Sequence, residues 1–381
     1  MFEHADIIVV GAGFYGAVIA EQAAASGLKV IVIDKRPHIG GNAYSEVDAE
    51  TGIEIHKYGS HFFHTSNTAV WNYLQRFTQF NAYQHRGFTR HNNRTYSLPI
   101  NLATMCQFFE KSLSPDEAKI LIGQQRTEAS TAKFPNLEDK AIALIGRPLY
   151  EAFIQGYTKK QWQTDPKLLP ESIITRLPVR FDFNNRYFND TYEGLPLHGY
   201  TTVFNKMLAH ENIEVKLGLD YFDLRSQICA RKTVVYTGPI DRYFNYAAGE
   251  LKWRTVDFSF EVENTGDFQG TSVMNFADED VPYTRIVEYR HLHPERNYQT
   301  EKTIISKEFS RNAGKTDEPY YPVATEADKR LYGEYKALTL SEKNIFFGGR
   351  LGTYHYLDMH QAIASALKDA PEIIEAARTA Q

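Results

Sequence analysis

The chain has 381 residues, of which 43% are hydrophobic and 23% are charged, and its formal net charge is −5. These proportions are close to globular averages and exclude a disordered or low-complexity chain, and a negative charge without a basic arm disfavours a nucleic-acid partner. No apolar run approaches the ~20 residues of a transmembrane helix, and residues 1–6 lack the basic and apolar segments of a signal peptide. The two cysteines, Cys106 and Cys229, form no metal-binding spacing. We therefore expect a reduced, cytoplasmic protein without membrane insertion.

The first 34 residues predict the order strand, glycine turn, helix, strand. An apolar run over residues 6–10 ends at Gly11, and Gly13 and Gly16 complete a GxGxxG motif before an alanine-rich helix over residues 17–25. A β-branched run over residues 29–33 then ends at Asp34. The glycines permit a tight turn and bring a pyrophosphate close to the helix N-terminus, while Asp34 lies at the distance that suits a ribose hydroxyl pair. The pattern predicts a dinucleotide site on a parallel sheet.

Two further glycine segments favour FAD over NAD. Residues 35–42 read Lys-Arg-Pro-His-Ile-Gly-Gly-Asn, which resembles the extended fingerprint of two-domain FAD proteins; an ordinary glycine turn would explain the glycine pair but not its position. Late in the chain, a strand over residues 344–347 leads into Gly-Gly-Arg-Leu-Gly and then into a helix that begins at Met359. We expect Asp358 to cap this helix, whose N-terminus would face the flavin and stabilise negative charge on the reduced ring.

Between these segments the sequence alternates between helix-like and strand-like patterns. Helices are expected over residues 101–111, 115–125 and 137–145, begun by caps at Asn101 and Ser114, and alternating strands over 256–260, 271–275, 284–289 and 302–309. A helix over 200–210 and strands over 214–217 and 233–236 suggest a return to the first domain. We predict an α/β fold in which a discontinuous Rossmann-like FAD-binding domain (1–75, 196–245 and 318–381) carries an inserted helical bundle (76–147) and an antiparallel-sheet substrate domain (148–195 and 246–317).

Rings and arginines occur together in the segments next to the predicted flavin site. They gather in residues 157–162, 176–181, 187–188, 282–285 and 319–322. A nucleoside diphosphate needs both a ring face for its base and guanidinium groups for its phosphates. Taken singly, each arginine also fits an exposed charge and each ring pair a core contact, so composition alone leaves this interpretation open.

The sequence offers no set of side chains for metal or covalent catalysis. His61 and His64 are three residues apart, but no third ligand lies at metal spacing beside them, so we expect no metal site and instead a contact with the flavin. A Ser-His-Asp order, a reactive cysteine and a catalytic carboxylate pair are all missing from the pattern. The chemistry should therefore belong to the cofactor.

Longer motifs extend over nearly the whole chain. They are residues 11–16, 35–44, 56–65, 157–162, 176–181, 187–188, 275, 282–285, 320–322 and 348–359, the last of which reads Gly-Gly-Arg-Leu-Gly-Thr-Tyr-His-Tyr-Leu-Asp-Met. In these motifs the chain resembles the bacterial UDP-galactopyranose mutase family. The resemblance implies interconversion of UDP-galactopyranose and UDP-galactofuranose with FAD that must be reduced, although the reaction has no net redox change. It implies that the reduced flavin N5 attacks the anomeric carbon, that UDP leaves, and that the flavin–sugar adduct opens as an iminium and recloses through another hydroxyl. It further implies a homodimer, an external flavin reductant, and a supply of galactofuranose for cell-surface glycans.

The resemblance also implies three sets of site residues. The catalytic set is His64, Arg176, Arg285 and Asp358. The substrate-binding set is His85, Phe153, Tyr157, Thr158, Trp162, Arg176, Tyr187, Phe188, Asn275, Arg285, Tyr321 and Tyr356. The cofactor-binding set is Gly11, Gly13, Phe14, Gly16, Asp34, Lys35, Gly41, Asn42, His61, Val215, Gly349, Arg350, Tyr356, Leu357, Asp358 and Met359. Arg176 and Arg285 would hold the diphosphate. A loop over residues 164–175 would be a mobile lid that carries Arg176 inward. Asp34 stands where many flavoproteins use Glu, and His85 stands where polar residues vary in the family.

Two alternatives use the same scaffold. An FAD-dependent oxidase of the amine-oxidase type shares both glycine motifs, but it gives no reason for paired arginines among uridine-sized aromatic groups. A non-catalytic binding protein, like the dissociation inhibitors of small GTPases, would lose the complete dinucleotide fingerprint that this chain keeps. The mutase interpretation is therefore preferred.

Overall fold

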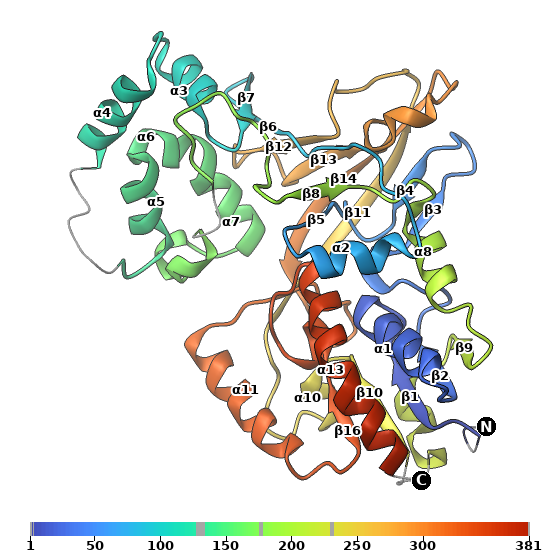
Figure 1. Cartoon of the computed structure of the whole chain (residues 1–381). Helices are drawn as coiled ribbons and strands as arrows, with labels where there is room; N and C mark the ends of the chain where they lie inside the picture. The colour runs from blue at the N-terminus through green and yellow to red at the C-terminus, as the bar shows by residue number, and fades with distance from the viewer. Residues whose placement is uncertain (1, 3, 127–133, 175–177, 229–231, 380–381) are drawn as a thin grey trace.

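The computed structural model describes residues 2, 4–126, 134–174, 178–228 and 232–379 and has three connected parts (Figure 1). A parallel sheet with its helices lies at the bottom of the view, a larger sheet lies above it, and a group of helices lies at the upper left. Both ends of the described chain lie at the lower end, beside the parallel sheet.

The lower part is built on a five-stranded parallel sheet with the order β16-β10-β1-β2-β9. Its strands, in that order, are Ile345–Phe347, Thr233–Tyr236, Ile7–Val10, Val30–Asp34 and Ile213–Leu217. Successive side chains of β1 face opposite sides, so Ile7 and Val9 join one core cluster and Ile8 joins another. Burial on both faces explains the continuous apolar runs of these strands, and the sheet confirms the predicted Rossmann-like part.

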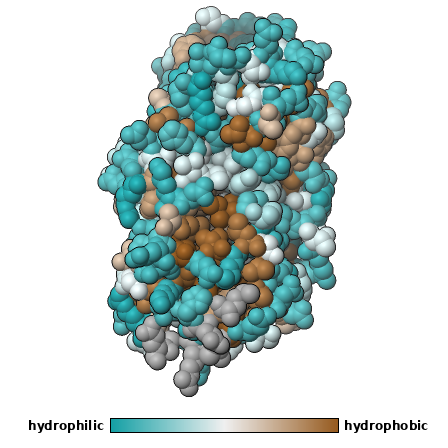
Figure 2. All heavy atoms as spheres, turned by 90° about the vertical axis from the view of Figure 1, so that its right-hand side faces the viewer, coloured by the Kyte–Doolittle hydropathy of each residue, from teal (hydrophilic) through white to brown (hydrophobic). Residues whose placement is uncertain are grey.

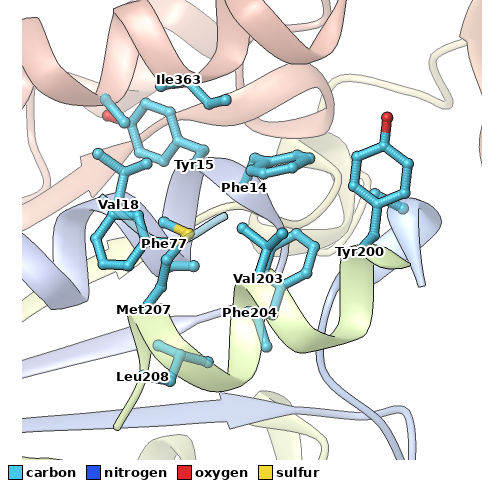
Figure 3. Packing of buried hydrophobic residues seen from close by; sticks show 14 of the residues in the cluster. Phe14, Tyr15, Val18, Phe77, Tyr200, Val203, Phe204, Met207, Leu208 and Ile363 are labelled. Carbon is cyan, nitrogen blue, oxygen red and sulfur yellow. The ribbon is translucent and has the colours of Figure 1, made fainter. Parts of the chain in front are cut away.

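Helices α1 (Phe14–Ala25) and α13 (Met359–Thr379) pack together on one face of this sheet, next to α8 (Gly199–Met207). Figure 3 shows the core between them, where the ring centroid of Phe14 lies 4.5 Å from that of Phe204 and Tyr15 points toward α13. The Tyr15 hydroxyl donates to Asp369 Oδ2 at 2.8 Å, which ties the first helix to the last. The remaining helices of this part are α2 (Thr68–Gln75), α9 (Tyr221–Leu224), α10 (Ile240–Tyr243), α11 (Glu326–Thr339) and α12 (Gly349–Gly352).

The upper sheet has seven strands in the order β15-β11-β14-β13-β12-β6-β7. In that order they are Tyr321–Pro322, Trp253–Glu263, Thr303–Asn312, Arg285–Glu288, Val273–Phe276, Gly87–His91 and Arg94–Leu98. All neighbours are antiparallel except β12 and β6, which are parallel. Two small antiparallel pairs join β3 (Ser45–Val47) to β4 (Glu54–His56) and β5 (Phe63–Thr65) to β8 (Tyr192–Gly194).

The structure differs from the helical bundle predicted over residues 76–147 at its start. Residues 87–98 form the hairpin β6–β7, whose strands belong to the upper sheet. Asn92 and Asn93 both have positive φ values, 48° and 59°, which is the backbone that a tight hairpin turn requires. An Asn-Asn turn between two short alternating segments was therefore the signal for a hairpin in this range.

The helical part begins after this hairpin and has its own core. Its helices are α3 (Leu102–Phe109), α4 (Pro115–Gln125), α5 (Leu137–Ile145), α6 (Arg147–Tyr150) and α7 (Gly156–Trp162), with a π-helical turn, Glu151–Gln155, between the last two. Asn101 and Ser114 cap α3 and α4, as the sequence predicts, and each forms a capping box. A cluster that includes Ile122, Ile142 and Tyr150 is buried between these helices.

The face of the molecule on the right-hand side of Figure 1 is mainly hydrophilic (Figure 2). An apolar patch surrounded by hydrophilic residues lies in the lower half of this face. Among the described residues, no helix combines the length and apolarity needed to cross a membrane.

Candidate functional site

A cavity of about 320 Å³ lies at the carboxyl ends of the parallel strands, where open α/β sheets bind their ligands. The loops after β1, β2, β10 and β16 all contribute to its lining. The predicted cofactor residues that line it are Gly11, Gly13, Phe14, Gly16, Asp34, Lys35, Gly41, Asn42, His61, Gly349, Arg350, Leu357 and Met359. The other three, Val215, Tyr356 and Asp358, are not among the described residues that line it. The cavity therefore brings together most of the predicted cofactor set.

The N-terminus of α1 fits an anionic ligand. Gly13 is its N-cap and supplies no side-chain cap, so the first N–H groups of the helix have no side-chain acceptor there. A Cβ atom at Gly16 would lie 2.0 Å from the Gly11 carbonyl oxygen, which explains the need for glycine at this helix–strand contact. A Cβ atom at Gly13 would meet only Gly41 Cα, at 3.9 Å, so the loop stays open at that point. These features suit a pyrophosphate group.

Asp34 lies at the end of β2, as predicted for a ribose contact. Its carboxylate accepts hydrogen bonds from the backbone N–H groups of Ala12 (2.8 Å) and Arg36 (2.9 Å), so it also holds the glycine loop in place. Arg36, which the sequence analysis did not assign, donates to Asn42 Oδ1 and Glu318 Oε2, both at 2.8 Å. Because Glu318 is 282 residues away in sequence, only the fold could reveal this pairing.

At the other end of the cavity, His61 and Arg350 are held by backbone carbonyls. His61 Nδ1 lies 2.6 Å from the Gly59 oxygen, so Nδ1 carries the proton and Nε2 is an acceptor in the neutral ring. Burial lowers the pKa of His61 to about 4, which keeps the ring neutral at pH 7. Arg350 donates to the carbonyls of Leu357 and Tyr320, which fixes the loop that leads into α13.

Arg285 lies on β13 and pairs with a carboxylate on the next strand. Its Nε donates to Glu308 Oε2 at 2.6 Å, and the Glu308 side chain is only 5% exposed. The carboxylate, with the nearby Tyr157 and Tyr321 hydroxyls, raises the pKa of Arg285 even though burial alone would lower it. Within the described part of the chain, Nε is the guanidinium atom with a hydrogen bond, so the terminal nitrogens are available to a ligand.

Tyrosines surround the two arginines. The Tyr321 and Tyr356 rings stack with centroids 5.8 Å apart, and the Arg350 guanidinium lies 4.8 Å from the Tyr356 centroid. Burial raises the pKa of Tyr157 to about 12, so its hydroxyl stays protonated and can donate to a phosphate oxygen. The predicted diphosphate contacts on β13, β15 and the loop before α13 therefore lie together.

The predicted base-binding residues separate into two groups. Tyr157 lies near Arg285, whereas the Phe153 ring is 4% exposed and packs edge-on against Tyr96, at 4.9 Å, inside the helical core. Thr158 is buried, Trp162 packs partly against the same core, and Asn275 Nδ2 donates to the Phe88 carbonyl at 2.9 Å. Phe153 thus lies inside the helical core in this structure.

Lys160 has a role that the sequence analysis missed. Its ammonium shares its three N–H groups among four carbonyl oxygens at the end of β12 and in the turn that follows, those of Phe276, Asp278, Val281 and Tyr283, at 2.7–3.1 Å. It joins α7, which carries Tyr157 and Thr158, to the hairpin that carries Asn275 and Arg285. Burial lowers the pKa of Lys160 to about 8.

His64 on β5 lies beside the start of α13. Its ring stacks on Phe188 at 3.6 Å, and its Nδ1 lies 2.7 Å from Asp190 Oδ2. His64, Asp358 and His360 each have a side-chain nitrogen or oxygen that could bind a metal ion, and these three atoms lie within 4.8 Å of one another. The predicted catalytic residues His64 and Asp358 are therefore neighbours. The expectation of no metal site stays a prediction.

His85 is buried between aromatic rings near this group. It stacks on Phe62 with centroids 4.1 Å apart and lies 5.3 Å from the Tyr187 ring. Burial, reinforced by the positive charge of Arg285, lowers the pKa of His85 to about 3, so the ring is neutral at pH 7. Tyr187 is 39% exposed.

The predicted lid is only partly described. Arg176 lies outside the described residues. Before it, residues 164–174 contain two short 3-10 helices, Pro166–Leu168 and Glu171–Ile173, and Leu169 and Ile174 are buried against the helical core. The predicted lid therefore lies against α5 in this structure, with the Leu169 carbonyl accepting from Leu137 N–H at 2.9 Å.

Comparison with known proteins agrees with this arrangement. The family model described as UDP-galactopyranose mutase matches residues 152–356, and a model for an NAD(P)-binding Rossmann-like domain matches residues 9–77. A probable UDP-galactopyranose mutase of Klebsiella pneumoniae is 44% identical over 97% of this chain and 94% of its own length. A dTDP-fucopyranose mutase of Escherichia coli is 40% identical over 96% of this chain and 97% of its own length.

Solved structures show the same fold at lower sequence identity. A crystal structure of reduced UDP-galactopyranose mutase aligns with a TM-score of 0.74 at 14% identity and covers 97% of this chain and 94% of that one. From the family model and the full-length relatives, the chain belongs to the UDP-galactopyranose mutase family.

Proposed function

We propose that this protein is a UDP-galactopyranose mutase that interconverts UDP-galactopyranose and UDP-galactofuranose with FAD in its reduced form. The observation that carries the proposal is Arg285, whose terminal nitrogens have no hydrogen-bond partner among the described residues and which lies among Tyr157 and Tyr321. Arg350, which lines the cavity at the glycine loops, lies next to Tyr321 and Tyr356. A diphosphate held there would place its sugar near the cofactor end of the cavity.

The residues of the cavity fit FAD. The start of α1 and Gly13 would hold the pyrophosphate, Asp34 a ribose, and His61, Arg350 and Met359 the flavin side. When bound, reduced FAD would supply the nucleophile for the anomeric carbon, because the described residues that line the cavity include no serine or cysteine.

The protein's own groups would act on the leaving UDP. As the bond to the anomeric carbon breaks, negative charge grows on the diphosphate. A guanidinium that is already in place therefore stabilises the transition state more than it stabilises the ground state. Glu308 holds the guanidinium of Arg285 in one orientation through Nε. The protonated Tyr157 and Tyr321 hydroxyls would donate to phosphate oxygens, since the pKa of each is raised by burial.

The finer predictions belong to the same proposal. Arg176 would complete the diphosphate site from the lid, and the rings of Tyr187 and Phe188 would contribute to the uridine pocket. We further propose a cytoplasmic homodimer whose flavin is reduced by an external donor and whose product serves cell-surface glycans. These statements are supported by the family resemblance.

The test is isomerisation of UDP-galactofuranose by the FAD-loaded protein, with and without dithionite, followed by separation of the two UDP-sugars. Conversion by the reduced protein alone is expected. Equal conversion by the oxidised protein would refute the role of reduced flavin, and oxygen consumption with an amine would support an oxidase. Because one relative is named for dTDP-fucopyranose, this sugar is tested in parallel. Conversion of the dTDP-sugar alone would refute the proposed substrate.

A further inference from the structure

Asp190 is a carboxylate that holds His64 but belongs to none of the predicted site sets. Its Oδ2 lies 2.7 Å from His64 Nδ1, and its Oδ1 accepts from the Ser66 hydroxyl at 2.8 Å. The Thr191 N–H donates in turn to Ser66 Oγ at 3.2 Å. Antiparallel pairing of β5 with β8, with Thr65 opposite Tyr192, brings Asp190 beside the His64 edge. Both oxygens of Asp190 are therefore used, and one is directed at the imidazole.

The same short segment also holds the face of the His64 ring. Phe188 stacks on it at 3.6 Å with an interplanar angle of 10°. A ring that is stacked on one face and hydrogen-bonded at one edge has little rotational freedom. Asp190 therefore fixes which nitrogen of His64 points away from β8.

The proton positions follow from the charge of Asp190. Burial alone would raise the pKa of Asp190, but the hydrogen bonds from His64 and Ser66 outweigh burial and lower it. An ionised carboxylate only accepts hydrogen bonds, so Nδ1 of His64 must carry the proton. In the neutral ring, Nε2 is then an acceptor.

We propose that Asp190 is a positioning residue that keeps the proton of His64 on Nδ1 and leaves Nε2 as the hydrogen-bonding atom toward the bound flavin and sugar. The inference rests on the proposed function for its catalytic consequence, whereas the tautomer of His64 can be measured without it. The other titratable groups that face His64 are His360 and Asp358 at the start of α13 and His85 before β6. The contact at His64 Nδ1 is the 2.7 Å hydrogen bond with Asp190 Oδ2.

The experiment uses the FAD-loaded protein with Asp190→Asn, His64→Asn and the double variant. Asp182→Asn is the matched control, because Asp182 is exposed in the same loop and, within the described ranges, its carboxylate accepts a hydrogen bond only from the nearby Asn184 N–H. Nitrogen NMR of protein labelled in its histidine rings reports the tautomer of His64, whose signals are those missing in His64→Asn. Flavin content and the urea midpoint verify that each variant folds.

We expect a proton on Nδ1 in the wild type and in Asp182→Asn. Asp190→Asn should lose this preference, because an amide can either accept from or donate to Nδ1. Activity of the reduced enzyme should fall about 10- to 100-fold in Asp190→Asn, as for other carboxylates that orient a functional histidine. In the His64→Asn background the same change should alter activity by about twofold or less, because Asp190 acts through His64.

A proton on Nε2 in the wild type would overturn the inference. An equal loss from Asp190→Asn with and without His64 would overturn it as well, since Asp190 would then act independently. A wild-type protein that fails to isomerise UDP-galactofuranose would instead refute the proposed function, and the tautomer would still decide the role of Asp190.

Discussion

Replacing Arg285 by alanine should separate catalysis from stability at this site. Among the described residues the guanidinium makes one charge-assisted hydrogen bond, at 2.6 Å to Glu308, and its terminal nitrogens would face the proposed diphosphate. Loss of a fixed group that stabilises growing charge lowers turnover by about 10²-fold or more. We expect a fall of at least this size in kcat for Arg285→Ala under reducing conditions.

The same change leaves Glu308 without its cation. The Glu308 side chain is 5% exposed and the Arg285 side chain is 24% exposed, so Glu308 is buried whereas Arg285 is partly solvated. Breaking one partner of a fully buried pair costs 3–5 kcal/mol, and partial solvation places this pair at the lower end. Unfolding in urea should therefore show a loss of about 3 kcal/mol.

A second substitution distinguishes the two effects. Adding Glu308→Gln to Arg285→Ala removes the unpaired charge, so most of the unfolding free energy should return while kcat stays low. Arg311→Ala is the control, because Arg311 is 39% exposed and forms surface ion pairs with Asp257 and Asp317, which are worth about 1 kcal/mol or less. Recovery of turnover in the double variant would refute the assignment of Arg285 to the diphosphate.

Three further predictions follow from buried contacts. Gly16→Ala should abolish flavin binding, measured by absorbance after purification, because its Cβ would lie 2.0 Å from a carbonyl oxygen; Gly123→Ala, with no atom within 4 Å, should bind flavin normally. Lys160→Met should raise the KM for the UDP-sugar about tenfold. Lys159→Met, which removes an exposed ion pair, should not raise it. Equal KM values for these two variants would contradict the role of Lys160. The pKa of His85 is about 3 when folded and near 6.5 when unfolded, so only the unfolded state gains this proton as the pH falls from 6.5. The free energy of unfolding, measured in urea, should thus fall by up to about 1.4 kcal/mol per pH unit below pH 6. His85→Gln should reduce this dependence on pH, and an unchanged dependence would show that His85 does not cause it.

Local patterns predicted much of the secondary structure. The helix over 115–125 and the strand over 233–236 have the predicted bounds, because a capping box and a β-branched run are signals within a few residues. The glycine loop was also predictable, since the turn, the helix N-terminus and Asp34 occur within 34 residues. Arg285 was identified by its motif, but its pairing with Glu308 depends on the register of β13 against β14.

Lys160 shows why the remaining contacts could not be read from the sequence. Lysine is usually exposed, so its place between Tyr157 and Trp162 suggested no role. The four carbonyls that it meets belong to a turn 116–123 residues later in the chain. The π-helical turn before α7 and Gly156, whose Cβ would lie 2.3 Å from the Ala277 carbonyl oxygen, bring the helix close enough for these bonds to form. The spacing between α7, which carries the proposed base side, and β13, which carries the proposed diphosphate side, thus depends on one half-buried ammonium. This spacing is a property of the fold that no local motif encodes.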